Sequence, residues 1–382
     1  IYRILIMYNI FFILYVGLLS HINAQNVAVT SFGIAVAAVG SRGGGLVLQQ
    51  NESIAPVAQF LPDDVLSFED VSFDAGNDSL VFALSIVSQR ACSFLLSTDN
   101  EALTLINCVG EGDNFSVRPF CGVSALDGTL IISGGTGGMT IYQYDSASGL
   151  ISDTPSVFNL DSRVVGHPDV LLLDANLAAL STDFNGVPRF GTQIVSIEGA
   201  SVNFVRDFRV QDSLGFNSNI SPANFPLVNA VYKEGSKAYM YTANGPMQVQ
   251  NPRSDDTPNL LCWASDGFSA VTVSVNTENK IAVFGGLSSS GASTVLVYDL
   301  SVDPRNPSLI SSIPLVDQRI TSIASGGNLI AYTTQGSSTI SYVLLPIEAT
   351  SSIMCTLSRS SYVGVDWCTL IPLFWSFCAL LM

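Results

Sequence analysis

The sequence is poor in the side chains that carry most hydrolytic and metal chemistry. It has 382 residues but only 2 histidines, and 12% of its residues are charged. His21 lies in an N-terminal apolar region, which leaves His167, close in sequence to Asp161 and Asp169, as the one imidazole of the remaining chain. A multi-histidine metal centre is therefore excluded there, and a Ser-His-Asp hydrolase would have to use His167. We expect this histidine to hold a loop through hydrogen bonds rather than to act as a base.

Basic residues are also scarce. The chain has 15 Lys plus Arg against 31 Asp plus Glu, a net charge of -16, and its lysines are Lys233, Lys237 and Lys280. The two ends carry Arg3, Arg359 and Asp366, so residues 25–350 are one unit more negative, at -17. Such a surface lacks the basic footprint that neutralises phosphates and repels anionic lipid headgroups. We therefore expect no nucleic-acid partner.

The cysteines do not form a metal-binding motif. No Cys-x-x-Cys pair occurs, so a zinc site has no local support. Cys92 and Cys108 flank a predicted hairpin whose turn spans Ser97 to Ala102, which places them nearly opposite on adjacent antiparallel strands. A disulfide between them is possible in geometry and would form in the secretory pathway. The alternative is that both are small buried apolar side chains.

Two local patterns suggest ligands but have simpler explanations. The glycine-rich stretch 134–138 lacks the Lys, the Ser or Thr and the helix of a phosphate loop, so it predicts a hairpin turn. Acidic residues cluster in one stretch and could bind Ca²⁺, although their spacing does not fit an EF-hand and such a run is usually a solvated surface. These residues are Asp63, Asp64, Glu69, Asp70, Asp74 and Asp78.

The N-terminal end is apolar and predicts export. Residues 4–19 form an apolar run preceded by Arg3, and Ile22 and Ala24 occupy the -3 and -1 positions of a cleavage site. Residues 1–24 are therefore interpreted as a secretory signal peptide. The alternative is an uncleaved signal anchor, for which the run is short.

The C-terminal end predicts membrane attachment. In residues 351–382 a polar spacer rich in small residues precedes the apolar tail Trp367–Met382, which is the layout of a GPI-attachment signal. Ser358 and Ser360 are candidate attachment residues, and Ser351 and Ser352 are also chemically acceptable. The alternatives are a short transmembrane anchor and an apolar extension from an incorrectly assigned gene end.

The middle of the chain repeats. Outside the terminal tails no segment longer than about eight residues keeps a helical period. Short apolar strands instead recur near seven anchor positions, separated by 47, 48, 53, 54, 48 and 45 residues, and each follows another short strand and a turn. The anchors are Val47, Phe94, Tyr142, Val195, Val249, Val297 and Tyr342. Seven units of this length predict an all-β fold, a seven-bladed β-propeller of four-stranded antiparallel blades over residues 25–350. A pair of β-sandwiches would not explain the even spacing.

The best-preserved unit, Cys121 to Gly149, resembles a WD40 repeat. It has an apolar first strand, a turn at Asp127-Gly128, a second strand, a glycine hairpin and a third strand that ends in Tyr144-Asp145, where the family has Trp-Asp. The unit ending in Tyr298-Asp299 is similar, and Gly166-His167 stands in the place of the family's Gly-His. The resemblance covers about two good units and five degenerate ones.

Four Asn-x-Ser sequons lie in predicted turns or connections between units, where a glycan is tolerated. They are Asn51, Asn77, Asn114 and Asn219. We expect some of them to be glycosylated if a eukaryotic cell secretes the chain.

These features predict a secreted or cell-surface propeller that acts as a non-catalytic binding module. Its ligand would be a protein or a glycan at one propeller face, with no cofactor, and the C-terminal anchor would tether it to the extracellular side of the plasma membrane. The main alternative is a propeller lactonase or hydrolase with Ca²⁺ at the channel mouth, which needs no histidine triad. An intracellular scaffold with a tail anchor is a further alternative.

Overall fold

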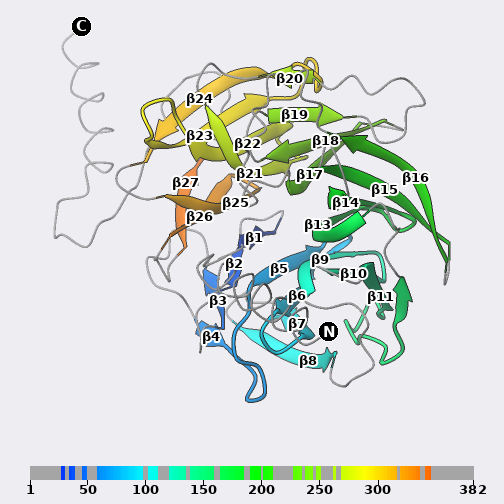
Figure 1. Cartoon of the computed structure of the whole chain (residues 1–382). Coiled ribbons are helices and arrows are strands. Elements are labelled where there is room, and N and C mark those ends of the chain that lie inside the picture. The colour runs from blue at the N-terminus through cyan, green and yellow to red at the C-terminus, as the bar shows by residue number, and fades with distance from the viewer. Residues whose placement is uncertain are drawn as a thin grey trace, which may run out of the picture.

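The fold is taken from a computed structural model of the whole chain (Figure 1). It describes residues 27–345 except 31–33, 39–44, 50–57, 98–101, 111–119, 135–137, 159–163, 185–189, 199–200, 210–226, 235–236, 244–246, 251–260, 264–267, 316–318 and 336–339. All the regular elements among these residues are β-strands.

The strands fall into seven consecutive groups, which we call blades one to seven. Blade one comprises β1 (Val27–Val29), β2 (Ala35–Ala38), β3 (Leu46–Gln49) and β4 (Ala58–Phe60). Blade two comprises β5 (Asp70–Asp74), β6 (Asn77–Ser85), β7 (Arg90–Leu96) and β8 (Leu103–Val109). Blade three comprises β9 (Phe120–Leu126), β10 (Thr129–Gly134), β11 (Gly138–Gln143) and β12 (Ser156–Phe158). Blade four comprises β13 (Val164–Asp174), β14 (Leu177–Phe184), β15 (Phe190–Glu198) and β16 (Ser201–Arg209). Blade five comprises β17 (Leu227–Glu234), β18 (Lys237–Ala243), β19 (Met247–Gln250) and β20 (Leu261–Trp263). Blade six comprises β21 (Ser269–Asn276), β22 (Ile281–Leu287), β23 (Ser293–Asp299) and β24 (Ser308–Pro314). Blade seven comprises β25 (Ile320–Gly326), β26 (Leu329–Thr334) and β27 (Ser341–Leu344).

The blades form a ring. Within each blade the strands pair antiparallel in chain order, and the first strands β1, β5, β9, β13, β17, β21 and β25 surround the centre in Figure 1. Blades two and three are joined into one sheet by a single parallel pairing, Asp74 opposite Ala125. Blade seven has three strands among the described residues, one fewer than the predicted four. The all-β, seven-bladed propeller predicted from the repeat spacing is confirmed.

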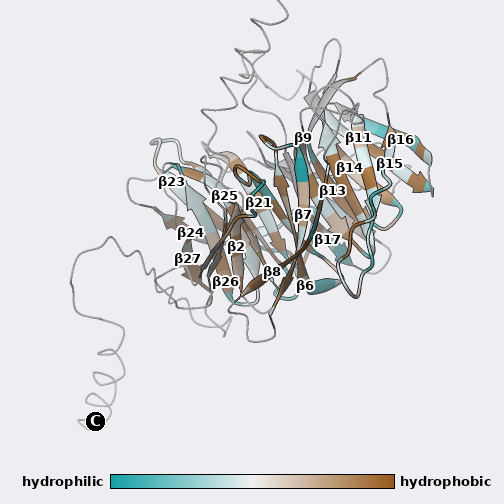
Figure 2. Ribbon diagram, turned by 90° about the horizontal axis from the view of Figure 1, so that it is seen from below, coloured by the Kyte–Doolittle hydropathy of each residue, from teal (hydrophilic) through white to brown (hydrophobic). Residues whose placement is uncertain are grey.

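The sequence anchors occupy one equivalent place in every blade. All seven lie in the third strand, from Val47 in β3 to Tyr342 in β27, and the apolar strand before each is the second strand of the same blade. These middle strands are the most apolar because both their faces are covered. Figure 2 shows the apolar residues running along the strands of the blades.

Among the described residues the core consists of seven clusters, one at each junction between successive blades. At the junction of blades four and five, for example, Ile194 and Leu173 pack on Met240. The other six clusters join blades one and two, two and three, three and four, five and six, six and seven, and seven and one. Each blade therefore buries its apolar surface only against its two neighbours, as in other repeat architectures.

Side-chain packing closes the ring between blades seven and one. Val27 and Ala35 pack with Ala331 of β26, and the Val27 backbone N donates to Ser322 Oγ at 3.3 Å. Gly326 packs so closely on the Thr30 carbonyl that an added Cβ would lie 2.0 Å from its oxygen. The closure therefore requires glycine at this position.

Several predicted features lie outside the described residues. These are the signal peptide over 1–24, the spacer and tail over 351–382 with Ser358 and Ser360, the sequons at Asn51, Asn114 and Asn219, and Asp161. Within the part of the chain that the structure describes, no helix is long and apolar enough to cross a membrane.

Candidate binding surface at the end of blade two

The connection between β4 and β5 is held firmly against the turn between β6 and β7. The Leu66 backbone N donates to Ser88 Oγ at 2.9 Å, and the Glu69 backbone N donates to the Leu84 carbonyl at 2.9 Å. The Glu69 carboxylate accepts hydrogen bonds from the Ser67 hydroxyl and from the Ile86 backbone N. Burial raises the pKa of Glu69 above its ordinary value despite these bonds. The connection is thus ordered by its own hydrogen bonds.

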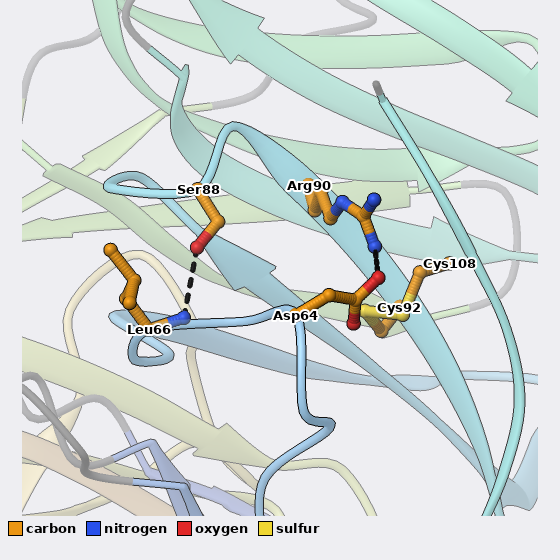
Figure 3. Close-up of polar contacts among 6 residues, drawn as sticks. All are labelled: Asp64, Leu66, Ser88, Arg90, Cys92 and Cys108. Atoms are coloured by element: carbon orange, nitrogen blue, oxygen red, sulfur yellow. Dashed lines mark hydrogen bonds and ion pairs between the residues drawn. A yellow bond between two sulfur atoms is a disulfide. The ribbon is translucent and has the colours of Figure 1, made fainter.

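An ion pair and a disulfide support the same end of the blade (Figure 3). Arg90, at the start of β7, pairs with Asp64 of the connection. Two residues further along β7, Cys92 lies opposite Cys108 of β8 and is joined to it by a disulfide. Cys92 is fully buried and packs in the cluster between blades one and two. The scaffold behind the connection is therefore covalently fixed.

This rigid end presents two exposed apolar side chains. Leu66 is 45% exposed and Val87 is 60% exposed, and they come from the two segments that the Leu66–Ser88 hydrogen bond joins. Asp63 and Asp64 are exposed beside Leu66 in the same connection. We call Asp63, Asp64, Leu66 and Val87 the blade-two surface. Because hydrogen bonds hold these segments in place, a partner that binds here would lose little conformational entropy on this side, which makes the blade-two surface a candidate for binding.

Two carboxyl groups from different blades lie close to each other at the inner strands. Asp70, the first residue of β5, accepts from the Val123 backbone N of β9 at 2.8 Å through Oδ2. Asp169 of β13 packs on the other side of the same strand, because a Cβ on Gly122 would lie 2.8 Å from Asp169 Oδ1. Burial, and secondly the charge of Asp70, raise the pKa of Asp169 well above its ordinary value. The two acids thus flank β9 in a poorly hydrated place.

Asp74 has a structural role at the opposite end of the blade. Its Oδ1 accepts from the backbone N of Gly76 at 2.9 Å and of Asp127, in the first turn of blade three, at 3.2 Å. Tyr144, which stands where the WD40 family has tryptophan, is buried there and packs on Phe82 with ring centroids 4.6 Å apart. Burial and the neighbouring Asp74 raise the pKa of Tyr144. Asp74 therefore joins blades two and three.

The acidic stretch does not gather into one site. Asp63, Asp64, Glu69 and Asp70 lie at the start of β5, whereas Asp74 and Asp78 lie around the turn at its other end. The described residues contain no group of three or more His, Cys, Asp or Glu side chains arranged to hold a metal ion. The Ca²⁺ site therefore stays a prediction.

Two other predicted positions can be placed. His167 lies within β13, the first strand of blade four, two residues before Asp169. The surroundings of its side chain lie outside the described part of the structure, so its expected role in holding a loop stays a prediction. Asn77 begins β6; its side chain accepts from the Ser79 backbone N at 3.1 Å and donates to the Ser146 carbonyl at 3.1 Å. Glycosylation of Asn77 would have to accommodate that second bond.

Sequence reasoning did not single out Leu66, Val87 or the approach of Asp70 to Asp169. The acidic run did mark the connection that carries Leu66. Val87 and Asp169 lie about 20 and 100 residues further along the chain, and only the pairing of strands and blades brings Val87 to Leu66 and Asp169 to Asp70.

Comparisons with known proteins identify the fold. No protein-family model matches the chain, and no curated protein matches it. Many solved structures do: the Cps50 (Swd1) β-propeller domain of Myceliophteria thermophila matches with a TM-score of 0.60 at 9% identity, over 85% of this chain and 98% of that one. Raptor of Chaetomium thermophilum matches with a TM-score of 0.58 at 12% identity, over 85% of this chain but 28% of that much longer chain.

A chain of the mitotic checkpoint complex matches with a TM-score of 0.54 at 10% identity, over 85% of this chain and 89% of that one. The RRP9 WD40 repeats match with a TM-score of 0.55 at 11% identity, over 82% of this chain and 88% of that one. At such low identities the similarity establishes the fold alone. The chain therefore has a WD40-type β-propeller fold, in agreement with the repeat around Tyr144-Asp145.

Proposed function

We propose that this protein is a non-catalytic binding module that holds a protein partner at the blade-two surface, on the extracellular side of the plasma membrane or as a secreted protein. The observation that carries the proposal is the exposure of Leu66 and Val87 on segments that hydrogen bonds, an ion pair and a disulfide hold in place. A partner that binds such a surface pays little ordering entropy on this side of the interface.

Two further observations favour this proposal. The propeller fold presents loops at both ends of its ring and needs no dedicated chemistry. One of the similar solved structures comes from a multi-protein assembly, the mitotic checkpoint complex. The hydrolase alternative keeps only its sequence-level support, since no specific arrangement of described residues favours it.

The secretory location is supported by the Cys92–Cys108 disulfide, because disulfides persist in oxidising compartments. Together with the apolar segments at 1–24 and 367–382, it motivates a direct test of processing. Expression of the full chain in eukaryotic cells should give a mature N-terminus at Gln25, a mass that falls on enzymatic deglycosylation, and release from membranes by phosphatidylinositol phospholipase. A protein that keeps residues 1–24 and stays in the cytosol would overturn the location.

The binding surface can be tested with matched variants. The double variant Leu66→Asp/Val87→Asp places two charges on the blade-two surface, and Leu309→Asp/Ile310→Asp places two charges on β24, where these residues are 52% and 56% exposed. Full-length proteins displayed on cells would be treated with a membrane-impermeant cross-linker, and the cross-linked partners identified by mass spectrometry. We expect a partner that the first variant loses and the second keeps. Equal loss or equal retention in both variants would contradict the proposal.

A further inference from the structure

The outer edge of blade seven is less covered than the equivalent edges of other blades. Blade seven has three strands among the described residues, whereas each of the other six blades has a fourth strand paired with its third. In β7, β11 and β23, third strands with such a neighbour, all residues but one are buried. In β27 Val343 is buried, while Ser341, Tyr342 and Leu344 are half-buried. Since neighbouring strands cover each other's side chains, this lower burial fits an edge to which the described residues supply no further strand.

The strand β27 also lacks the features that protect a sheet edge which stays open. Such edges commonly carry charged side chains, prolines or β-bulges, which discourage pairing with another chain. The outer pairings of β16 and β24 each contain a bulge. In contrast, β27 has the sequence SYVL, without charge or proline, and its register with β26 is continuous from Ser341 to Leu344. An edge of this kind is suited to pair with one more strand.

The chain that follows β27 contains a suitable segment at the right distance. The connection from the third strand to the fourth is 2 residues long in blade four, 6 in blade two, 8 in blades one and six, 10 in blade five and 12 in blade three. A fourth strand of blade seven should therefore begin between residues 347 and 357. In this window residues 352–357, SIMCTL, combine four apolar side chains with the β-branched Thr356, whereas Glu348 and Ala349 before them are residue types depleted in strands.

We propose that residues 352–357 form the fourth strand of blade seven by pairing antiparallel with β27. The connection, residues 345–351, is then 7 residues long, inside the range of the other blades. This segment has an advantage over any separate chain, because a short connection gives it a high effective concentration at the edge. A second copy of the protein is further disfavoured, since both copies carry a net charge of -16.

The proposed strand extends the propeller beyond residue 350 and restricts where a lipid could be attached. Attachment at Ser351 or Ser352 would remove the residues that follow from the mature chain, so the proposal excludes both positions. Attachment at Ser358 or Ser360 keeps the strand and places the lipid within three residues of its end. The tether would then leave the propeller at the outer edge of blade seven.

Disulfide trapping in the full-length protein tests the pairing. Cys355 lies inside the proposed strand and supplies one thiol. Four single substitutions place the second thiol along β27: Ser341→Cys, Tyr342→Cys, Val343→Cys and Leu344→Cys. Opposite residues of antiparallel strands lie within disulfide reach, so mild oxidation should join Cys355 to one of these cysteines. Leu309→Cys, on exposed β24, is the control, and its yield with Cys355 should be at least about tenfold lower. Peptide mapping by mass spectrometry identifies the pairs.

Hydrogen exchange provides a second measurement that needs no new cysteine. Of two consecutive strand residues, one directs its N–H at the neighbouring strand, and proline has no N–H to donate. Ile353→Pro/Met354→Pro should therefore speed amide exchange in β27 by at least about tenfold. Ala349→Pro/Thr350→Pro, in the connection, is the matched control and should leave these rates unchanged.

Four outcomes would overturn the proposal. They are the absence of a Cys355 disulfide from all four β27 variants, equal exchange rates in the two proline variants, a Cys355 disulfide that joins two copies of the chain, and a mature C-terminus at Ser351 or Ser352. None of these outcomes bears on the blade-two surface, so the proposed function is tested separately.

Discussion

At the scale of single residues, polar side chains form hydrogen bonds across the junctions between blades. The Tyr241 hydroxyl of blade five donates to the Pro304 carbonyl of blade six at 2.6 Å, and both residues are buried. Asp70 and Asp74 make comparable bonds from blade two to the backbone of blade three. Since each of these bonds crosses a junction, each helps to set the position of one blade relative to the next.

Tyr241→Phe should lower the free energy of unfolding by about 1–3 kcal/mol, because the buried Pro304 carbonyl loses its donor. Burial raises the pKa of Tyr241, which keeps its hydroxyl a donor across the working pH range. Urea unfolding followed by tryptophan fluorescence measures the change. Tyr232→Phe is the control, since the Tyr232 hydroxyl makes no hydrogen bond among the described residues and its loss should cost little. Equal effects of the two variants would rule out the junction bond as the cause.

The pH dependence of stability provides a second residue-scale prediction. Asp169 has a folded-state pKa above its ordinary value, so the folded protein binds this proton more tightly than the unfolded chain does. As pH rises above about 4, the unfolded chain loses the proton first, and wild-type stability falls until pH passes the folded-state pKa. Asp169→Asn lacks this loss, so its stability relative to wild type should increase with pH over that window.

The contribution of Asp145 to stability should change with pH in the opposite direction to that of Asp169. Hydrogen bonds from Ser148 hold the pKa of Asp145 below its ordinary value, so its contribution to stability is present above about pH 4 and is lost as pH falls. Relative to wild type, Asp145→Ala should therefore be less stable at neutral pH and should recover in acid. Thermal unfolding of Asp169→Asn and Asp145→Ala in buffers over the same pH range tests both predictions. If the stability of each variant followed the same pH dependence as wild type, both predictions would be wrong.

At the scale of strands, β7 and β8 support the candidate surface from behind. Their register places Cys92 opposite Cys108, with a bulge directly after, between Ser93 and Phe94. Comparable bulges interrupt the outer pairings of β16 and β24, next to the exposed Phe204 and Leu309. Bulges twist an edge strand away from further pairing, so they help to protect the open edges of these blades.

Removing the disulfide should destabilise the fold. The bond closes a loop with a sequence separation of 16, for which chain entropy predicts a contribution of about 3 kcal/mol. We expect Cys92→Ala/Cys108→Ala to lose roughly this amount in urea unfolding. Dithiothreitol should destabilise wild type to the same extent and leave the variant unchanged. A variant that still responds to the reductant would show that another cysteine pair is responsible.

At the scale of the whole molecule, the ring closes without a strand shared between blades one and seven in the part of the chain described. The closure depends on the small cluster around Val27 and Ala331 and on the close approach of Gly326 to Thr30. Because all seven junctions belong to one ring, weakening this one removes support from both terminal blades.

Gly326→Ala should test this closure. The added Cβ would lie 2.0 Å from the Thr30 carbonyl oxygen, which is backbone and cannot move aside cheaply. Overpacking of this kind costs about 1–3 kcal/mol, and separation of blades one and seven would add to it. Gly291→Ala is the matched control, since nothing lies within 4 Å of its Cβ and only its φ of +80° opposes the change. Hydrogen exchange should show faster exchange in β1 and β25 for Gly326→Ala alone.

The sequence by itself determined the repeating units, because each blade needs its own apolar second and third strands and its own turns. Spacing alone therefore predicted seven blades, and the turn between Ser97 and Ala102 predicted that Cys92 and Cys108 face each other. Only the tertiary structure decided which polar residues meet across blades. Asp70 and Asp169 are about 100 residues apart and flank β9, while Leu66 and Val87 share one end of blade two because a serine hydroxyl joins their segments. Local periodicity records which side chains must be buried, but closing the ring brings distant residues into contact.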